Sequence, residues 1–519
     1  MEMQNQELEI NKTEQKNMLV FAVITAAAFL VLLYGSVFKG IPMGINVVLF
    51  IAVCYIGMAA VLGKRFLSAL KETIFTTSAV VLLGITFILY NNLILLSING
   101  FLIVMLVGAQ YRYMLKRKKN DLYSLGFIRD ANVVWFGYTF GGMGGAFKTT
   151  GRDKKQGSVK GLVIGIAVTI PVLAAVIALL MSADLAFSDI MQNIFKGWNA
   201  ADVFGNIIVG IILFFCAAGL IYSLHTRIPR AEEKPEKLFR FNRIAIKLLV
   251  GCVDAVLAIF AALQFTYLFA GNVPAGYTYA TYAQNGFWQL VGVAVIVAAI
   301  VFIMRKTVEV AKGNNKSIRI LLAFLCALTE IILVSAFWRM SLYEQAYSFS
   351  ILRIFTQAFM VATAGVFIVL AISLFRPALN INKWIFIVGT VCYLALNFMN
   401  ADAFIARQNI ALGKEKADIA YLTGLSVDAL PYYADKIEAE VDRGINERYN
   451  RPADEGRFDY EHLLLCKKLA DMREGVNKAS GWQYFNTGRE KAKAYLSEYG
   501  SVFDKAEEYW KTNSMMFFD

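Results

Sequence analysis

Two acidic residues, Asp254 and Glu330, interrupt long apolar stretches of the chain. A carboxylate is costly inside a bilayer, so it is retained there when it carries a proton or an ion, or when it pairs with a base. On facing helices the two acids would be the carriers of a proton- or ion-coupled transporter. In the alternative, which we favour, Glu330 forms a structural ion pair with Arg339 or Arg353, and Asp254 lies at a water-exposed helix end.

A second set of candidate residues lies where apolar stretches end. Asp184 and Asp402 are the most plausible acids if the protein is a membrane enzyme that acts on a lipid-linked substrate. Tyr282 and Trp288 belong to a connection rich in aromatic residues, 272–288. Such residues are typical of the membrane–water interface, and they could also form a binding surface for a lipid or a partner.

Metal and cofactor chemistry is not indicated. The chain has only two histidines, His225 and His462, which excludes a multi-histidine haem, copper or non-haem iron site. Of its 6 cysteines, Cys466 alone lies outside the apolar stretches, so no metal-ligand spacing occurs. We therefore expect no metal and no cofactor, and we assign no catalytic residue.

Membrane helices are the elements that must position these residues. The 519 residues are 58% hydrophobic and 17% charged, with a mean hydropathy of +0.53, which excludes an ordinary soluble enzyme. A helix of about 20 apolar residues crosses a hydrocarbon core of roughly 30 Å. One such span is predicted in each of 17–38, 40–63, 161–183, 203–226, 320–338, 354–374 and 384–400, and two in 248–304. Two more are predicted in 73–111, with the polar pair Asn91 and Asn92 at the turn between them. The fold class is thus an all-α polytopic bundle of about eleven spans.

The distribution of charge orients this bundle. With a cytoplasmic N-terminus, 30 Lys and Arg residues fall in inside segments and only 4 in outside loops, as the positive-inside rule requires. A basic cluster at 112–119 adjoins a span, so it indicates contact with lipid headgroups, and we expect no nucleic-acid partner. The predicted location is a bacterial plasma membrane, with the C-terminus extracytoplasmic.

The sequence changes character after residue 400. Residues 401–519 hold 17 basic and 21 acidic residues with amphipathic helical spacing, which predicts a soluble extracytoplasmic helical domain. The predicted organisation is a tail over 1–17, a transmembrane domain over 18–400 and this domain over 401–519. Asp402 is predicted to cap a helix over 403–411, and Ser426 a helix over 427–441.

A set of short motifs recurs at the ends of the apolar stretches, and the most specific is 400–410, which contains Asn400, Asp402, Arg407 and Asn409. The other motif residues are Ser182, Ala183, Asp184, Phe187, Tyr282, Ala283, Gly286, Phe287, Trp288, Leu290, Arg339, Tyr343, Tyr347, Arg353, Tyr421, Leu422, Leu425, Ser426, Asp428, Ala429, Pro431, Trp482, Asn486, Arg489 and Ala492. Through these residues, roughly 160–497 resembles a family of multi-pass bacterial membrane proteins known as domain of unknown function 4173, related to family 4153. The resemblance implies a bacterial integral membrane protein and no particular activity.

Three functions are compatible with these features. The first is a non-enzymatic sensor or scaffold that presents the extracytoplasmic helices to an envelope protein or ligand, with Asp402, Arg407 and Asn409 coupling those helices to the bundle. The second is a transporter or lipid-handling protein that uses Glu330 and Asp254. The third is the membrane enzyme with Asp184 and Asp402 as its acids. We favour the first, with the lipid bilayer as the common partner.

Overall fold

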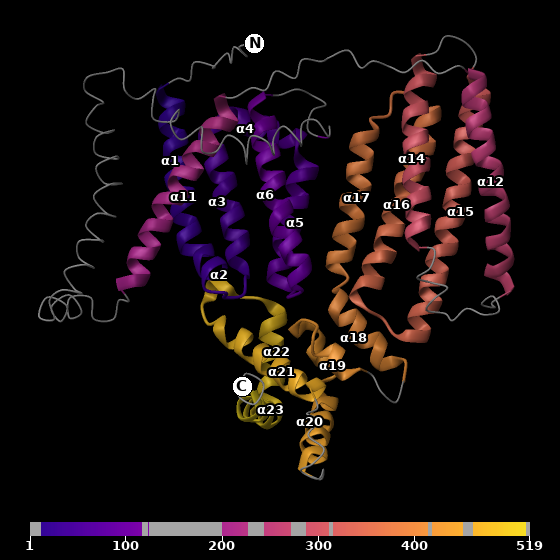
Figure 1. The fold of residues 1–519 in the computed structure, drawn as a ribbon. Coiled ribbons are helices and arrows are strands. Elements are labelled where there is room, and N and C mark those ends of the chain that lie inside the picture. The colour runs from indigo at the N-terminus through magenta and orange to yellow at the C-terminus, as the bar shows by residue number, and fades with distance from the viewer. Residues whose placement is uncertain are drawn as a thin grey trace, which may run out of the picture. The chain divides into compact units, whose positions relative to one another are not determined.

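The computed structural model describes residues 12–116, 123, 200–226, 243–270, 287–310, 315–413, 418–449 and 460–514. Within these ranges every regular element is a helix and no strand occurs (Figure 1). The contacts divide the chain into two compact units. The first unit comprises 1–89, 97–230 and 477–486, and the second comprises 90–96, 231–476 and 487–519.

The first unit contains the N-terminal helices. They are α1 (Lys12–Ala28), the π-helix η1 (Phe29–Leu33), α2 (Tyr34–Phe38), α3 (Ile45–Leu62), α4 (Lys64–Glu72), α5 (Ile74–Leu89), most of α6 (Leu93–Lys116) and α11 (Ala200–Thr226). Gly63 adopts a φ of 54°, in the range that favours glycine, at the bend between α3 and α4. The short 3₁₀ helix η5 (Trp482–Tyr484) belongs to this unit, and the Phe485 carbonyl accepts from the Ile45 amide at 3.1 Å.

The second unit contains five long helices and the shorter C-terminal helices. The long ones are α12 (Arg243–Ala270), α14 (Phe287–Val310), α15 (Lys316–Tyr347), α16 (Ile351–Phe375) and α17 (Ile381–Phe398). The C-terminal helices, a term used here for the helices within 401–478 and 487–514, are α18 (Ala401–Ala411), α19 (Ile419–Leu422), η4 (Val427–Tyr432), α20 (Ala434–Tyr449), α21 (Tyr460–Lys478, whose last two residues fall in the first unit), α22 (Thr487–Glu498) and α23 (Gly500–Ser514). Segment 90–96, which opens α6, belongs to this unit.

Seven of the described helices are long and apolar enough to cross a membrane, or eight if α4 and α5, bent by 87°, form one span. The sequence predicted about eleven. One predicted span, 161–183, lies outside the described residues. Helices α11 and α14 contribute only the shorter apolar stretches Val209–Tyr222 and Gly292–Arg305, and α5 alone has 16 residues. Each of the other predicted ranges coincides with a helix, and Asn91 and Asn92 separate α5 from α6, as predicted.

The long helices of the second unit pack through apolar seams. Helix α12 buries Ile246, Val250, Leu257 and Ala261, spaced by four or seven residues, against a core that includes Leu322 and other residues of α15. This spacing places the side chains on one helix face. The seam is the main contact of α12, and it determines the surroundings of Asp254.

The C-terminal helices have a hydrophobic core of their own. It includes Leu430, Ile437, Leu469 and Phe503, which come from η4, α20, α21 and α23 and are almost fully buried. Because these helices are short, their stability depends on this shared packing more than on helix propensity.

Two predicted helices in this region differ from the structure, although a helix does begin at Val427 after Ser426 as predicted. The N-cap of α18 is Asn400 and not Asp402: the Asn400 side chain accepts from the Ala403 amide at 3.4 Å. The predicted helix over 427–441 is divided into η4 and α20, and Ser426 makes no side-chain cap. Pro431 lies inside η4, and since proline lacks an amide hydrogen it opposes one continuous α-helix.

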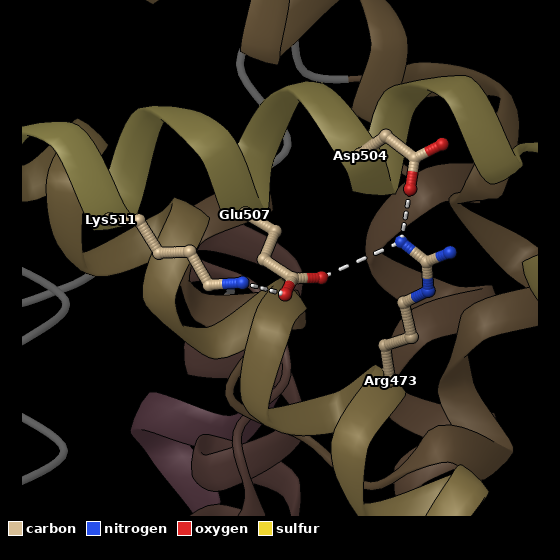
Figure 2. A network of polar contacts seen from close by, with 4 residues as sticks. All are labelled: Arg473, Asp504, Glu507 and Lys511. Atoms are coloured by element: carbon tan, nitrogen blue, oxygen red, sulfur yellow. Dashed lines mark hydrogen bonds and ion pairs between the residues drawn. The ribbon is translucent and has the colours of Figure 1, made fainter.

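An ion-pair network on the surface joins α21 to α23 (Figure 2). Arg473 approaches Asp504 at 2.5 Å and Glu507 at 3.6 Å, and Glu507 also pairs with Lys511 at 2.6 Å. The Asp504 side chain is 68% exposed, so solvent screens these pairs and each contributes at most about 1 kcal/mol. The network orients α23 but does not dominate its stability.

Replacing a core residue should therefore cost far more than breaking the network. We expect Leu469→Ala to lower the free energy of unfolding by about 2–5 kcal/mol, and Arg473→Ala by no more than about 1 kcal/mol. Thermal unfolding of the purified full-length protein in detergent, followed by tryptophan fluorescence, would measure both. Equal losses in the two variants would contradict this assignment of the core.

Candidate functional site

A buried polar cluster in the second unit joins the C-terminal helices to segment 90–96. We call it the docking cluster; its members are Asn91, Asn92, Asp402, Asp428 and Arg489. Asp402 is 2% exposed, and each of its carboxylate oxygens has a donor. The Asn92 side-chain amide donates to Oδ1 at 2.8 Å, and the Ser426 backbone amide donates to Oδ2 at 3.1 Å.

Asp428 is held in the same way by Asn91. The Asn91 backbone amide donates to Asp428 Oδ2 at 2.6 Å, and the Asn91 side-chain amide donates to Oδ1 at 2.9 Å. Burial raises the pKa of Asp428, and the hydrogen bonds from Asn91 oppose this rise because they favour the charged form. One asparagine thus satisfies both carboxylate oxygens.

Arg489 completes the chain of polar contacts. Its guanidinium donates to Asn91 Oδ1 at 2.8 Å, so Asn91 connects Arg489 to Asp428. Burial lowers the pKa of Arg489 to about 10, while the negative charge of Asp428 acts to raise it. Arg489 is therefore a buried cation at neutral pH, and the opposite charge of Asp428 offsets part of its desolvation cost.

The residue before Arg489 must be small. A Cβ atom on Gly488 would overlap Asp428 Oδ1 and lie 2.5 Å from the side-chain nitrogen of Asn91. The first turn of α22 can approach the docking cluster only because glycine has no side chain.

A second contact fixes the far end of α18. The Asn409 side chain accepts from the Phe349 amide at 2.6 Å and donates to the Phe349 carbonyl at 2.9 Å. Nearby, the Ile351 amide donates to the Tyr421 hydroxyl at 3.0 Å. Phe349 and Ile351 lie where α15 gives way to α16, so Asn409 attaches α18 to that connection.

The candidate residues predicted at the ends of the apolar stretches and within 400–410 have different environments. Asn400 caps α18 with a left-handed φ of 52°, Asp402 and Asn409 make the buried contacts, and Arg407 is exposed and takes no part in them. Asp184, Tyr282 and the side chain of Trp288 lie outside the described residues.

The intramembrane acids are not paired with the arginines considered for them. Among the described residues Glu330 forms no ion pair, and its Oε1 has no hydrogen-bond partner. Arg353 instead donates to the carbonyls of Tyr347 and Ser348 and lies over the Tyr343 ring at 4.2 Å, and Arg339 is half-buried. Asp254 is 4% exposed, so it does not lie at a water-exposed helix end as the favoured alternative required.

Sequence reasoning missed four members of the docking cluster. Asp428 and Arg489 were among the residues that carry the family resemblance, which was the available signal. Asn91 and Asn92 appeared only as a polar break between two apolar stretches. Their partners lie more than 300 positions away, and no local pattern indicates such a pairing.

The chain has the features of an integral membrane protein. It has several long apolar helices, and its buried polar contacts lie near the start of α6, the start of α16 and the end of α17. It belongs to the family described as a domain of unknown function (DUF4153), which matches residues 77–435. No curated protein and no solved structure matches the chain. The matched range includes Asn91, Asn92, Asp402 and Asp428 and ends before Arg489.

The close approach at Gly488 gives a test of the docking cluster. We expect Gly488→Ala to lower the free energy of unfolding by about 1–3 kcal/mol, because the methyl group displaces Asp428 or Asn91 from buried hydrogen bonds. Gly475→Ala in α21 is the matched control. No atom lies within 4 Å of its added Cβ, so it should be neutral or stabilising by up to about 1 kcal/mol.

Thermal unfolding of the full-length variants in detergent measures both effects. The docking cluster would be disproved as a stabilising contact if Gly488→Ala unfolded at the same temperature as Gly475→Ala.

Proposed function

We propose that this protein is a non-enzymatic membrane sensor or scaffold, in which the helical bundle presents the C-terminal helices to an envelope protein or ligand. One observation carries the proposal: within the second unit, the C-terminal helices contact segment 90–96 and the connection between α15 and α16 through buried, directional hydrogen bonds. A tethered domain that moved independently of its anchor would not need such contacts.

The two contacts support coupling between the C-terminal helices and the membrane helices. Asn92 and Asp402 connect the start of α6 to α18, and Asn409 connects α18 to the start of α16. Helix α18 also follows α17 directly in the chain. Suppose that a ligand binds the C-terminal helices more tightly in one conformation of these contacts. It would then increase the population of that conformation, and with it the matching positions of the membrane-helix ends.

The environment of Asp402 speaks against the enzyme hypothesis. Both of its oxygens accept hydrogen bonds from the protein and the side chain is 2% exposed. A general acid or base must come within hydrogen-bond reach of its substrate. Asp402 therefore suits a structural contact better than catalysis.

We further propose a bacterial plasma membrane location, a cytoplasmic N-terminus, an extracytoplasmic C-terminal domain over 401–519, and about eleven spans. The excess of basic residues in the predicted inside segments, 30 against 4, supports this orientation. We also propose that the relation to family 4173 inferred from the sequence is genuine.

The orientation has a direct test. Alkaline phosphatase, which is active only outside the cytoplasm, should be active when fused to the C-terminus. Green fluorescent protein, fused at the same position and exported by the secretory route, should not fluoresce. Bright fluorescence together with an inactive phosphatase would place the C-terminal helices in the cytoplasm and overturn the orientation.

The coupling proposal is tested by complementation of a strain that lacks the gene, grown under envelope stress. We expect Asn409→Ala to lose complementation at normal membrane abundance, because the Phe349 amide and carbonyl lose their partner, at a cost of about 1–3 kcal/mol. The exposed Arg407→Ala is the matched control and should complement fully.

The same assay separates the sensor from the transporter. If Asn409→Ala complements and Asp254→Asn and Glu330→Gln do not, the transporter or lipid-handling alternative replaces the sensor.

A further inference from the structure

Asp254 occupies the centre of the buried face of α12. Ile246, Val250, Leu257 and Ala261 are at most 7% exposed, and Asp254, at 4%, continues their spacing. The carboxyl group of Asp254 therefore occupies a position in the α12–α15 seam where the spacing of buried residues predicts an apolar side chain. Neither carboxyl oxygen has a hydrogen-bond partner within the described part of the protein.

The facing helix supplies a thiol and a second acid. Cys326 on α15 is 1% exposed, and its thiol lies within electrostatic range of both Asp254 and Glu330. Cys326 and Glu330 are four residues apart, so they share one face of α15. The seam thus contains two acids, of which Asp254 is buried and Glu330 is half-buried.

No described base neutralises Asp254. On its own helix Lys247 is exposed, two turns away. On α15 Arg319 is half-buried and precedes Cys326 by seven residues, about 10 Å along the helix. On α14, which also packs against α15, Arg305 donates to the carbonyls of Ser373 and Pro377. None of these forms an ion pair with Asp254 in the described ranges.

An ionised carboxylate in such a place is far more costly than a neutral carboxylic acid. The donor set does not suit a metal ion, because within the described residues no group of three or more His, Cys, Asp or Glu side chains could hold one. We propose that Asp254 is a proton-binding site in the membrane part of the protein, occupied at neutral pH, with Glu330 as a second acid on the facing helix. This inference does not rest on the sensor proposal.

Dicyclohexylcarbodiimide tests the proposal directly. This apolar reagent adds a protonated carboxyl group across its C=N bond, and the O-acylisourea so formed rearranges to a stable N-acylurea that keeps every atom of both reactants. The full-length protein in lipid vesicles is treated at pH 7, and the adduct is located by mass spectrometry of peptides. At pH 7 a half-occupied site is protonated several hundred times as often as an aspartate with an ordinary pKa of about 3.9. We therefore expect labelling of Asp254 to exceed that of the exposed Asp504 by about a hundredfold or more.

Two variants serve as controls. Asp254→Asn should lose the adduct on this peptide, whereas Glu330→Gln should retain it on Asp254. The proposal is overturned if Asp254 stays unmodified while Glu330 is labelled, or if a water-soluble carbodiimide modifies Asp254 as readily as Asp504.

A stability measurement provides a second readout. Asparagine has the shape of a neutral aspartic acid, so Asp254→Asn should unfold in detergent at nearly the wild-type temperature at pH 7. A loss as large as that of Leu469→Ala would show that the protein stabilises the charged form, and would contradict the proposal. Neither result depends on whether Asn409→Ala complements, so the sensor proposal and the proton site can fail separately.

Discussion

The attachment of the C-terminal helices depends on one interaction, the pairing of two buried aspartates with two consecutive asparagines. Burial of a carboxylate without hydrogen-bond donors costs the folded state several kcal/mol of free energy, so a buried carboxylate needs donors within the protein. Asp402 and Asp428 find them in Asn92 and Asn91. Asn91 also accepts from Arg489, and the absence of a side chain at Gly488 leaves room for this arrangement. The position of α18, η4 and α22 follows from satisfying these few atoms.

Asp254 shows the other outcome of the same constraint. It is as deeply buried as Asp402, yet no described group donates to it or balances its charge. The difference separates two uses of a buried acid. Satisfied acids hold helices together, whereas an unsatisfied acid in an apolar seam is suited to take up a proton. Both kinds of buried acid occur in the second unit. Because different residues carry them, structural coupling and proton binding are separate hypotheses.

The family has no known function, so a function can be inferred only from the residues of the site. The matched range includes both the asparagine pair and its aspartate partners, so the contacts among these four residues lie within the part of the chain that matches the family. A sensor or scaffold requires a mechanical connection between its membrane and C-terminal parts. The paired contacts of Asn92 and Asn409 provide such a connection without any catalytic group.

The sequence by itself determined the helical class, most helix positions and the break at Asn91 and Asn92, because apolar runs and helical periodicity are local properties. It also selected Asp402 and Asn409, through the resemblance at 400–410. Only the tertiary structure decided that Asn400 caps α18, that Pro431 lies in a separate 3₁₀ helix, and that Glu330 is not paired with Arg339 or Arg353. The partners of Asp402 and Asp428, and the apolar surroundings of Asp254, are set by the packing of helices far apart in the chain. No local pattern contains that information, because a buried side chain meets whatever the fold brings to it.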